Sequence, residues 1–429
     1  MKKARLAIAV LATAALWGFN PWDTHALSGE ILPAEPNTNV LGECDFDPGD
    51  PIVKVPVAAG AEAFRCGLAT FQVHMFNKPF ADKFDRFPPE RVNAEKPGDL
   101  FLLRVAPATS IGGAKIEFPN GIVYCSHFNP PVTRWSRSDG MIGLDVLVQH
   151  IVQVDFDEGK LRFLRAVPKA AGERFDIVSL QQRPRLCALT VKAQCCDEPA
   201  EEFFVQLENP DAIQLRSRVY RKLVKKGSIR RFHRESTLGL ILESECWAGT
   251  ADSFTIGRFQ TKDVRAVVGG DNLIGLGYLS RFVVTFDFPR GFMYLQPGNQ
   301  IDREDAHDVS GLGMVLKNDS PVIRRIEPGS TAEAAGFKTR DVIVDVDGQT
   351  INRENLASLW RKLRHEGSTL HIRVKRGGDE ITFDLKLEET PEERGAADKP
   401  PGPIVPNYLP HRGPLKLPEL IASGEPKNA

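Results

Sequence analysis

The chain has 429 residues, of which 42% are hydrophobic and 26% are charged, and its formal net charge is −1. This length allows two to four domains, each with a hydrophobic core of its own. A net charge this close to zero gives no global case for binding nucleic acid, so we predict no nucleic-acid partner.

The first 26 residues have the pattern of a signal peptide. Lys2, Lys3 and Arg5 precede an apolar, uncharged run over residues 6–19, and residues 24–26 offer small side chains at the cleavage positions. Such a run is short for a membrane span. We therefore expect residues 1–26 to be removed and the protein to be exported, to a periplasmic or extracellular location, rather than held by a membrane anchor.

Two β-rich regions follow a linker. Residues 27–50 are rich in Pro, Gly, Asp and Asn, which predicts a linker. Residues 51–166 and residues 184–298 both contain short runs of β-branched and aromatic residues that are broken by Gly and Pro. This pattern is typical of strands joined by tight turns, so we predict that both regions are mainly β.

The two β-rich regions carry the same sequence pattern. Gly143, Asp155 and Gly159 recur 132 positions later as Gly275, Asp287 and Gly291. A constant spacing over three positions indicates a duplicated unit. Because Asp before a Gly turn is ordinary turn chemistry, we interpret Asp155 and Asp287 as hairpin caps rather than as a catalytic pair.

The repeated pattern resembles a known family. Asp139-Gly-Met-Ile-Gly-Leu-Asp-Val-Leu and Asp271-Asn-Leu-Ile-Gly-Leu-Gly-Tyr-Leu are similar to the C-terminal half of a retropepsin-like aspartic protease lobe. In that family, an upstream hairpin in each lobe delivers an Asp-Thr-Gly motif, and the two aspartates meet between the lobes. The resemblance covers roughly residues 50–298 and implies two pepsin- or retropepsin-like β lobes with a substrate cleft between them.

The catalytic motifs of that family are degenerate in this chain. The resemblance aligns Gly67 with the first aspartate and Glu208 with the second, where Asn209 and Pro210 replace Thr and Gly. Aspartic proteolysis needs two carboxylates that share one proton, and a single carboxylate cannot both activate water and donate to the scissile carbonyl. We therefore assign no catalytic residue and expect the protease-like body to be inactive.

The seven cysteines fit no compact disulfide scaffold and no metal-binding spacing. Two pairings stay open, Cys44 with Cys66, and Cys246 with one of Cys187, Cys195 or Cys196. We expect buried or bridged thiols, and no bound metal or other cofactor. Residues 216–234 contain nine Lys and Arg, which favours a solvated helix and loop, while association with an anionic envelope surface is the alternative.

A third pattern covers residues 308–389. Pro328-Gly-Ser-Thr-Ala, Ala335-Gly-Phe-Lys and Arg340-Asp-Val-Ile occur in the order and spacing of a bacterial PDZ domain, which this region resembles. The resemblance implies a β-sandwich-like domain with two helices that binds peptides or protein C-termini. The peptide-binding residues would be Gly311, Leu312, Gly313 and Met314 in the carboxylate-binding loop and strand, with Leu356, Leu359 and Leu363 on the groove helix. Core packing is an equal explanation for Leu312 and Met314 and the main explanation for most of the helix stripe.

Residues 390–429 contain nine prolines and are expected to be disordered. Together these patterns predict a mainly β, exported protein in which an inactive aspartic-protease-like body is coupled to a peptide-binding PDZ domain. The alternative is an exported aspartic endopeptidase whose PDZ domain selects substrates.

Overall fold

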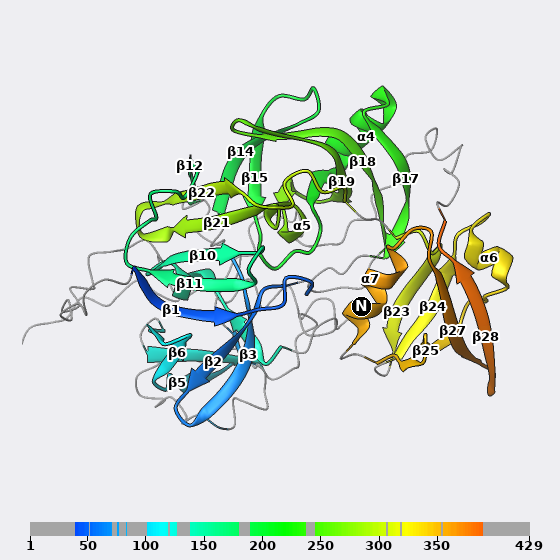
Figure 1. Cartoon of the computed structure of the whole chain (residues 1–429), viewed down its shortest axis with the longest axis horizontal. Helices are drawn as coiled ribbons and strands as arrows, with labels where there is room; N and C mark the ends of the chain where they lie inside the picture. Colours follow the sequence, from blue (N-terminus) through cyan, green and yellow to red (C-terminus); the bar gives the residue numbers. More distant parts are fainter. Residues whose placement is uncertain are drawn as a thin grey trace, which may run out of the picture.

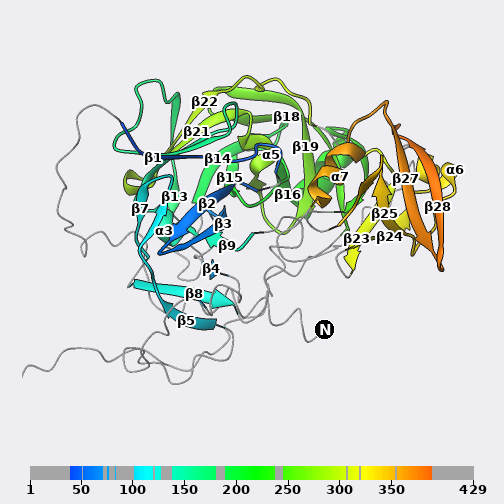
Figure 2. The same ribbon diagram turned by 60° about the horizontal axis from the view of Figure 1, so that its bottom comes forward.

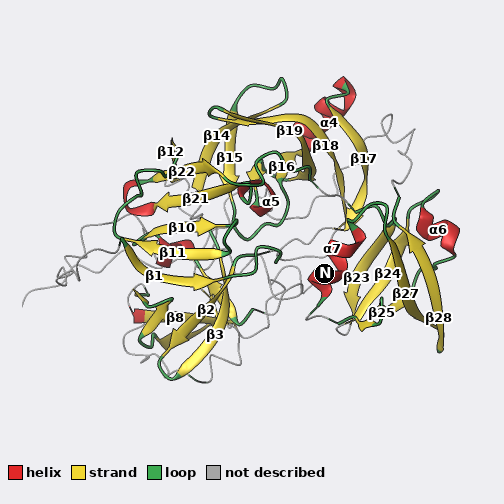
Figure 3. Ribbon diagram, in the orientation of Figure 1, coloured by secondary structure: helices red, strands yellow, loops and turns green. Residues whose placement is uncertain are grey.

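The computed structural model places most of the chain between residues 39 and 388. The described residues are 39–50, 52–70, 75–76, 83, 101–118, 121–126, 138–179, 189–236, 245–305, 308–317, 320–352 and 355–388. The predicted signal peptide and the predicted tail lie outside these residues. Over the described residues the fold is mainly β, as predicted (Figure 3). None of their helices has the length and apolar character to cross a membrane.

A six-stranded antiparallel sheet joins the two repeated units (Figure 1). In order across the sheet, its strands are β1 (Val40–Asp45), β11 (Lys160–Leu164), β10 (Ile151–Asp155), β21 (Phe282–Asp287), β22 (Phe292–Pro297) and β12 (Glu173–Asp176). The hairpin β10–β11 is the copy of β21–β22 in the sequence repeat. The two copies therefore pair with each other at the centre of the sheet, and each is flanked by one further strand.

Strand β1 corrects part of the predicted linker. Its residues pair with β11 from Val40 to Asp45, although they were assigned to the linker 27–50. Strand β12 likewise precedes the predicted start of the second region at residue 184. Both strands are short edge strands with few buried side chains, so the hydrophobic alternation that reveals a strand in sequence is weak in them.

The first unit contains an eight-stranded sheet in which a strand from the repeat lies between two upstream strands. Its order is β5 (Phe101–Val105), β8 (Ile122–Ser126), β4 (Met75–Phe76), β9 (Gly140–Ile142), β3 (Glu62–Leu68), β2 (Lys54–Ala59), β6 (Thr109–Ile111) and β7 (Ala114–Ile116). Strand β9 runs parallel to β3 and antiparallel to β4.

The second unit repeats this arrangement. Its order is β13 (Val178–Ser179), β14 (Leu189–Cys195), β15 (Glu201–Val205), β20 (Leu273–Ile274), β16 (Ile213–Arg216), β19 (Phe259–Gly269), β18 (Glu245–Ile256) and β17 (Ile229–Ser236). Strand β20 runs parallel to β15 and antiparallel to β16, as β9 does to β3 and β4. The duplication seen in the sequence is therefore also a duplication of strand topology.

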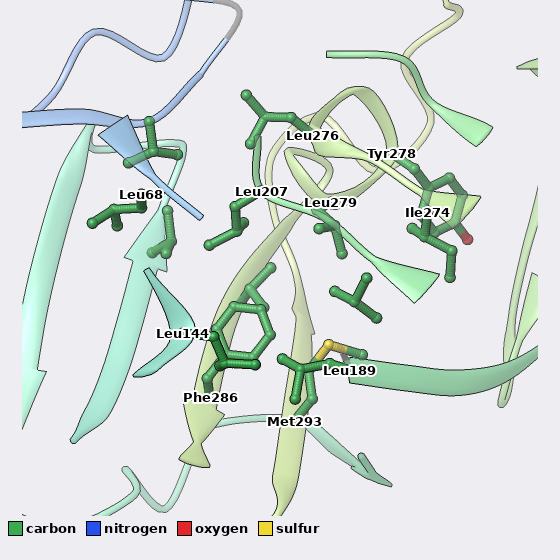
Figure 4. Close-up of a cluster of buried hydrophobic side chains, with 14 of the residues drawn as sticks. Leu68, Leu144, Leu189, Leu207, Ile274, Leu276, Tyr278, Leu279, Phe286 and Met293 are labelled. Carbon is green, nitrogen blue, oxygen red and sulfur yellow. The ribbon is translucent and has the colours of Figure 1, made fainter. Parts of the chain in front are cut away.

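One of the repeated glycines, Gly275, lies where two backbones approach closely. Gly143 and Gly275 precede one-turn helices, α3 (Leu144–Leu147) and α5 (Leu276–Leu279). A Cβ atom on Gly275 would lie 2.2 Å from the carbonyl oxygen of Asp211. Behind these turns, one hydrophobic core spans both units, and Figure 4 shows Leu68 of the first unit clustered with Leu207 and Leu276 of the second.

The region predicted to resemble a PDZ domain forms a separate sheet with its own core (Figure 2). The sheet order is β23 (Leu312–Lys317), β24 (Ser320–Ile326), β25 (Val342–Val346), β27 (Thr369–Arg376) and β28 (Asp379–Lys386), and β26 (Gln349–Thr350) pairs with β25. Its two helices are α6 (Thr331–Ala335) and α7 (Leu356–Leu363). Strand β17 of the second unit lies beside β23, and the Arg361 guanidinium lies 3.8 Å from the Asp47 carboxylate.

Candidate functional site

Two parts of the structure contain the residues singled out in the sequence: the junction of the two units, near residues 66–70 and 204–211, and the edge of the C-terminal sheet at β23. At the junction, the ladders define which residues correspond. Leu68 pairs with Ile142, and Val205 pairs with Ile274. Because Ile142 and Ile274 are copies of each other, Leu68 and Val205 are equivalent. The next residues are also equivalent, because Ala69 donates its N–H to the carbonyl of Ile142 and Gln206 donates its N–H to the carbonyl of Ile274.

This register corrects the alignment of Gly67 with Glu208. Gly67 lies opposite Met141, which makes Phe204 its counterpart, because Phe204 lies opposite Leu273 in the second unit. A Cβ atom on Gly67 would lie 2.7 Å from the Sδ atom of Met141, so glycine here serves packing. Leu68 and Ile142 differ by 74 in residue number (142 − 68), whereas Val205 and Ile274 differ by 69 (274 − 205). Because these separations are unequal, the constant spacing of the repeat could not align the residues upstream of it.

Thr70 of the first unit binds the backbone of the second. Its hydroxyl donates to the carbonyl oxygen of Val205 at 2.7 Å and accepts from the N–H of Leu207 at 3.1 Å. Its own N–H donates to the Glu208 carboxylate at 2.9 Å. Glu208 is fully buried, so its carboxylate lies within the junction of the two units rather than at a solvent-filled cleft.

A second buried carboxylate follows Glu208 three residues later in the chain. The Asp211 carboxylate accepts from the Arg265 guanidinium at 2.6 Å, and both side chains are buried. The backbone N–H of Arg265 also donates to Asp305 at 2.9 Å, and Asp305 forms a 2.8 Å ion pair with the fully buried Arg281. These contacts hold the segment after β22 against the second unit, and sequence spacing gave no sign of them because the partners are distant in the chain.

The other residues weighed in the sequence have structural roles. Asp155 accepts from the N–H groups of Asp157 and Glu158, so it caps the β10–β11 turn as predicted. The basic segment forms α4 (Ser217–Lys226) and then strand β17 instead of a loop. Several of its cations are paired; Lys222 and Lys226 both contact Glu198, for example.

The structure narrows the disulfide alternatives. Cys44, Cys66, Cys195 and Cys196 are free thiols. Cys195 lies opposite Phe254 in the β14–β18 ladder, eight residues along β18 from Cys246, a separation of about 26 Å at strand spacing. A bridge from Cys246 to Cys195 or Cys196 is therefore excluded. Among the described residues, no group of three or more His, Cys, Asp or Glu side chains is arranged to hold a metal ion.

At the C-terminal sheet, the predicted peptide-binding residues come together. Leu312 and Met314 on β23 share one core with Leu356, Leu359 and Leu363 on α7. All five side chains are buried, and their part in peptide binding stays a prediction. Strand β23 is the edge strand of its sheet and pairs with β24 on one side.

The loop before β23 is held by internal hydrogen bonds. The carboxylate of Asp308 accepts from the backbone N–H of Ser310 at 2.8 Å and from the Ser310 hydroxyl at 2.5 Å. That hydroxyl accepts from the N–H of Leu312 at 3.1 Å. Gly311 has a φ of +71°, and a Cβ atom there would lie 2.3 Å from the Cβ of Ser330. Asp308 and Ser310 were not among the residues singled out in the sequence, although Asp-x-Ser before Gly is a recognisable turn pattern.

Comparison with known proteins identifies one part of the chain. Residues 310–387 match the model of the PDZ domain family. A putative zinc metalloprotease of Xylella fastidiosa (strain Temecula1 / ATCC 700964) is 39% identical over 85 residues, which are 20% of this chain and 19% of that protein. The serine protease Do-like HtrA of Bacillus subtilis (strain 168) is 32% identical over 95 residues, 22% of this chain and 21% of that protein.

The chain spans about a fifth of the length of the curated proteins it matches. Among solved structures, the HtrA3 PDZ domain bound to a phage-derived ligand (FGRWV) is 21% identical, with a TM-score of 0.16 over 18% of this chain and 80% of that chain. The photosystem II D1 C-terminal processing protease is 26% identical, with a TM-score of 0.17 over 18% and 22% of the two chains. The match to the family model identifies residues 310–387 of this protein as a PDZ domain.

Proposed function

We propose that this is an exported peptide-binding protein, in which the PDZ domain holds an extended segment or the C-terminus of another protein. The observation that carries the proposal is the position of β23, an edge strand beside α7 in a domain of the PDZ family. An edge strand offers N–H and C=O groups with which an added peptide strand can pair. Because β17 lies beside β23, a bound segment would also contact the body.

We further propose that the body is a retropepsin-like pair of lobes without protease activity. Two observations support this proposal. The strand topology is duplicated, and the positions that follow the paired strands β3 and β15 are occupied by Ala69 and Gln206, neither of which is an acid. The two buried carboxylates of the junction, Glu208 and Asp211, are bound by the Thr70 N–H and by the Arg265 guanidinium, and not by each other, so the proton-sharing chemistry of aspartic proteolysis has no basis there. Glu208 supplies one buried carboxylate, and Thr70 already binds it.

A matched pair of variants tests the peptide-binding proposal. Leu356 on α7 and Leu385 on β28 are both fully buried in the PDZ core. Each change to alanine should destabilise the domain by about 2–5 kcal/mol. Binding of the full chain to a phage-displayed library with free C-termini, followed by fluorescence polarisation with the selected peptides, should show weaker affinity for Leu356→Ala alone. Equal loss in both variants, or no selected peptide, would refute the proposal.

The inactive body is tested by a peptidase assay at acidic and neutral pH. We expect no turnover of unfolded protein substrates. Pepstatin-sensitive turnover that disappears in Glu208→Gln would instead support the alternative of an aspartic endopeptidase.

A further inference from the structure

Two adjacent cysteines lie where three elements of the second unit meet. Cys195 ends β14, and Cys196 begins the turn to β15, next to β18 and the residue after the α4 cap. Their sulfur atoms are 3.9 Å apart, and the Cys196 thiol donates to the carbonyl oxygen of Ser228 at 3.6 Å. Cys195 is buried, whereas Cys196 is partly exposed. The pair thus joins a partly exposed cysteine to a buried one.

The backbone holds the two thiols on the same side. Successive side chains of a strand point to opposite faces. Cys196 breaks this alternation with a φ of +53°, in the left-handed region that residues other than glycine rarely adopt. Hydrogen bonds fix this turn, because Cys196 donates its N–H to the carbonyl of Ser253 at 2.9 Å and Glu198 donates to that of Cys195 at 3.2 Å.

The pKa values of the two thiols are shifted in opposite directions. A hydrogen bond from the Cys195 thiol lowers the pKa of Cys196 to about 7, and N–H groups of Ser253 and Asp252 add to the effect. The pKa of Cys195 is raised, first by the same hydrogen bond and then by burial. The lowered pKa makes the Cys196 thiolate easier to form, and the thiolate is the reactive form.

We propose that Cys195 and Cys196 are a redox-active dithiol that reduces small disulfides and closes to a vicinal disulfide. The Cys196 thiolate attacks one sulfur of a disulfide R–S–S–R, forms Cys196–S–S–R and releases RS⁻, which takes up a proton. The Cys195 sulfur then attacks Cys196 and releases the second RS⁻, which accepts the Cys195 proton. Two protein thiols are oxidised, and one small disulfide is reduced to two thiols.

The closed form should be easily reversed. Consecutive Cα atoms are about 3.8 Å apart, closer than the roughly 4.4–6.8 Å of ordinary disulfides. Strained disulfides are the labile and regulatory ones. Closure would also withdraw the Cys196 sulfur from Ser228, just after α4. The site would then act as a reversible switch at the corner between the β14–β15 hairpin and α4.

The wild-type chain itself provides the test. Trypsin cleavage after Lys192 and Arg216 gives a peptide of residues 193–216 that contains Cys195 and Cys196 and no other cysteine. The native full chain would be equilibrated with oxidised and reduced glutathione, alkylated, digested and weighed by mass spectrometry. We expect this peptide to lose two hydrogen atoms and escape alkylation under oxidising mixtures, and to regain both thiols under reducing ones.

One variant tests the role of Cys195, and a second variant at a distant cysteine is the control. In Cys195→Ala, the reaction should stop at a glutathione adduct on Cys196, and alkylation of Cys196 at pH 7 should slow about tenfold as its pKa rises. Cys44→Ala should leave peptide 193–216 unchanged. The proposal is overturned if the native chain keeps two alkylatable thiols in this peptide at every glutathione ratio, or if the peptide is linked to one that contains Cys187.

Discussion

Gln153 and Thr285 are equivalent residues of the two repeated units, and they pair with each other. They lie opposite one another in the β10–β21 ladder, and the Gln153 amide donates to the Thr285 hydroxyl at 3.1 Å. Because β10 and β21 run antiparallel, the pair Gln153 and Thr285 is the one position of this ladder at which a residue lies opposite its own copy. This pair therefore marks the pseudo-twofold axis of the duplicated body. Both side chains are buried, which makes their hydrogen bond part of the contact between the units.

Removal of this hydrogen bond should destabilise the body. Thr285→Val leaves the buried Gln153 amide without this acceptor, and we expect a loss of about 1–3 kcal/mol in the free energy of unfolding. The double change Gln153→Leu with Thr285→Val removes both partners and should recover part of that loss. Urea unfolding followed by tryptophan fluorescence would measure it. A double variant that is less stable than the sum of the single changes would contradict this explanation.

Loss of the Thr70 hydroxyl should destabilise the protein more than the small size of the group suggests. Thr70→Val keeps the shape but leaves the Val205 carbonyl and the Leu207 N–H without their hydroxyl partner, so we expect a loss of about 2–4 kcal/mol. Thr70→Ser keeps the hydroxyl and is the matched control. Denaturant midpoints of the two variants provide the comparison. If serine and valine destabilise equally, the hydroxyl is not what joins the units.

His150 should make the protein less stable in mild acid. Burial lowers its pKa to about 4, against about 6.5 for an unfolded chain, and its ring packs edge-on against Phe163. Between pH 6.5 and pH 4 the unfolded chain takes up a proton that the folded protein resists, so stability falls by up to about 3 kcal/mol as the pH drops.

The pH effect is isolated by comparison with His150→Gln. The difference in unfolding free energy between the wild type and this variant should be constant above pH 7 and should shrink or reverse toward pH 4.5. A difference that does not depend on pH would show that His150 protonates equally in both states.

The PDZ loop gives a prediction on peptide recognition. Because the Ser310 hydroxyl accepts the N–H of Leu312, Ser310→Ala should free that donor for a peptide carboxylate. We expect the variant to bind free-acid peptides several-fold more tightly, with no gain for the same peptides carrying a C-terminal amide. Fluorescence polarisation with both forms measures this. An equal gain for both would mean that the freed N–H does not reach the carboxylate.

Sequence patterns revealed the parts of the fold that depend on local chemistry. The Gly143 and Gly275 pair was visible because glycine recurs at a constant spacing, and at Gly275 a close backbone approach excludes any side chain. The PDZ region was visible because its turns and cap lie close together in sequence. The register at Leu68 and Val205 was not visible, because it depends on pairing across loops of unequal length. The Thr70 and Asp211 contacts join distant segments and were missed for the same reason.

The pairing of β10 with β21 also has an evolutionary consequence. Two identical units that met through this sheet would form a symmetric dimer, in which every substitution appears twice. A single chain that contains both units is free of that constraint. Thr70 occupies the junction in one unit, while Leu207 holds the equivalent place in the other, so each half could specialise without altering its copy.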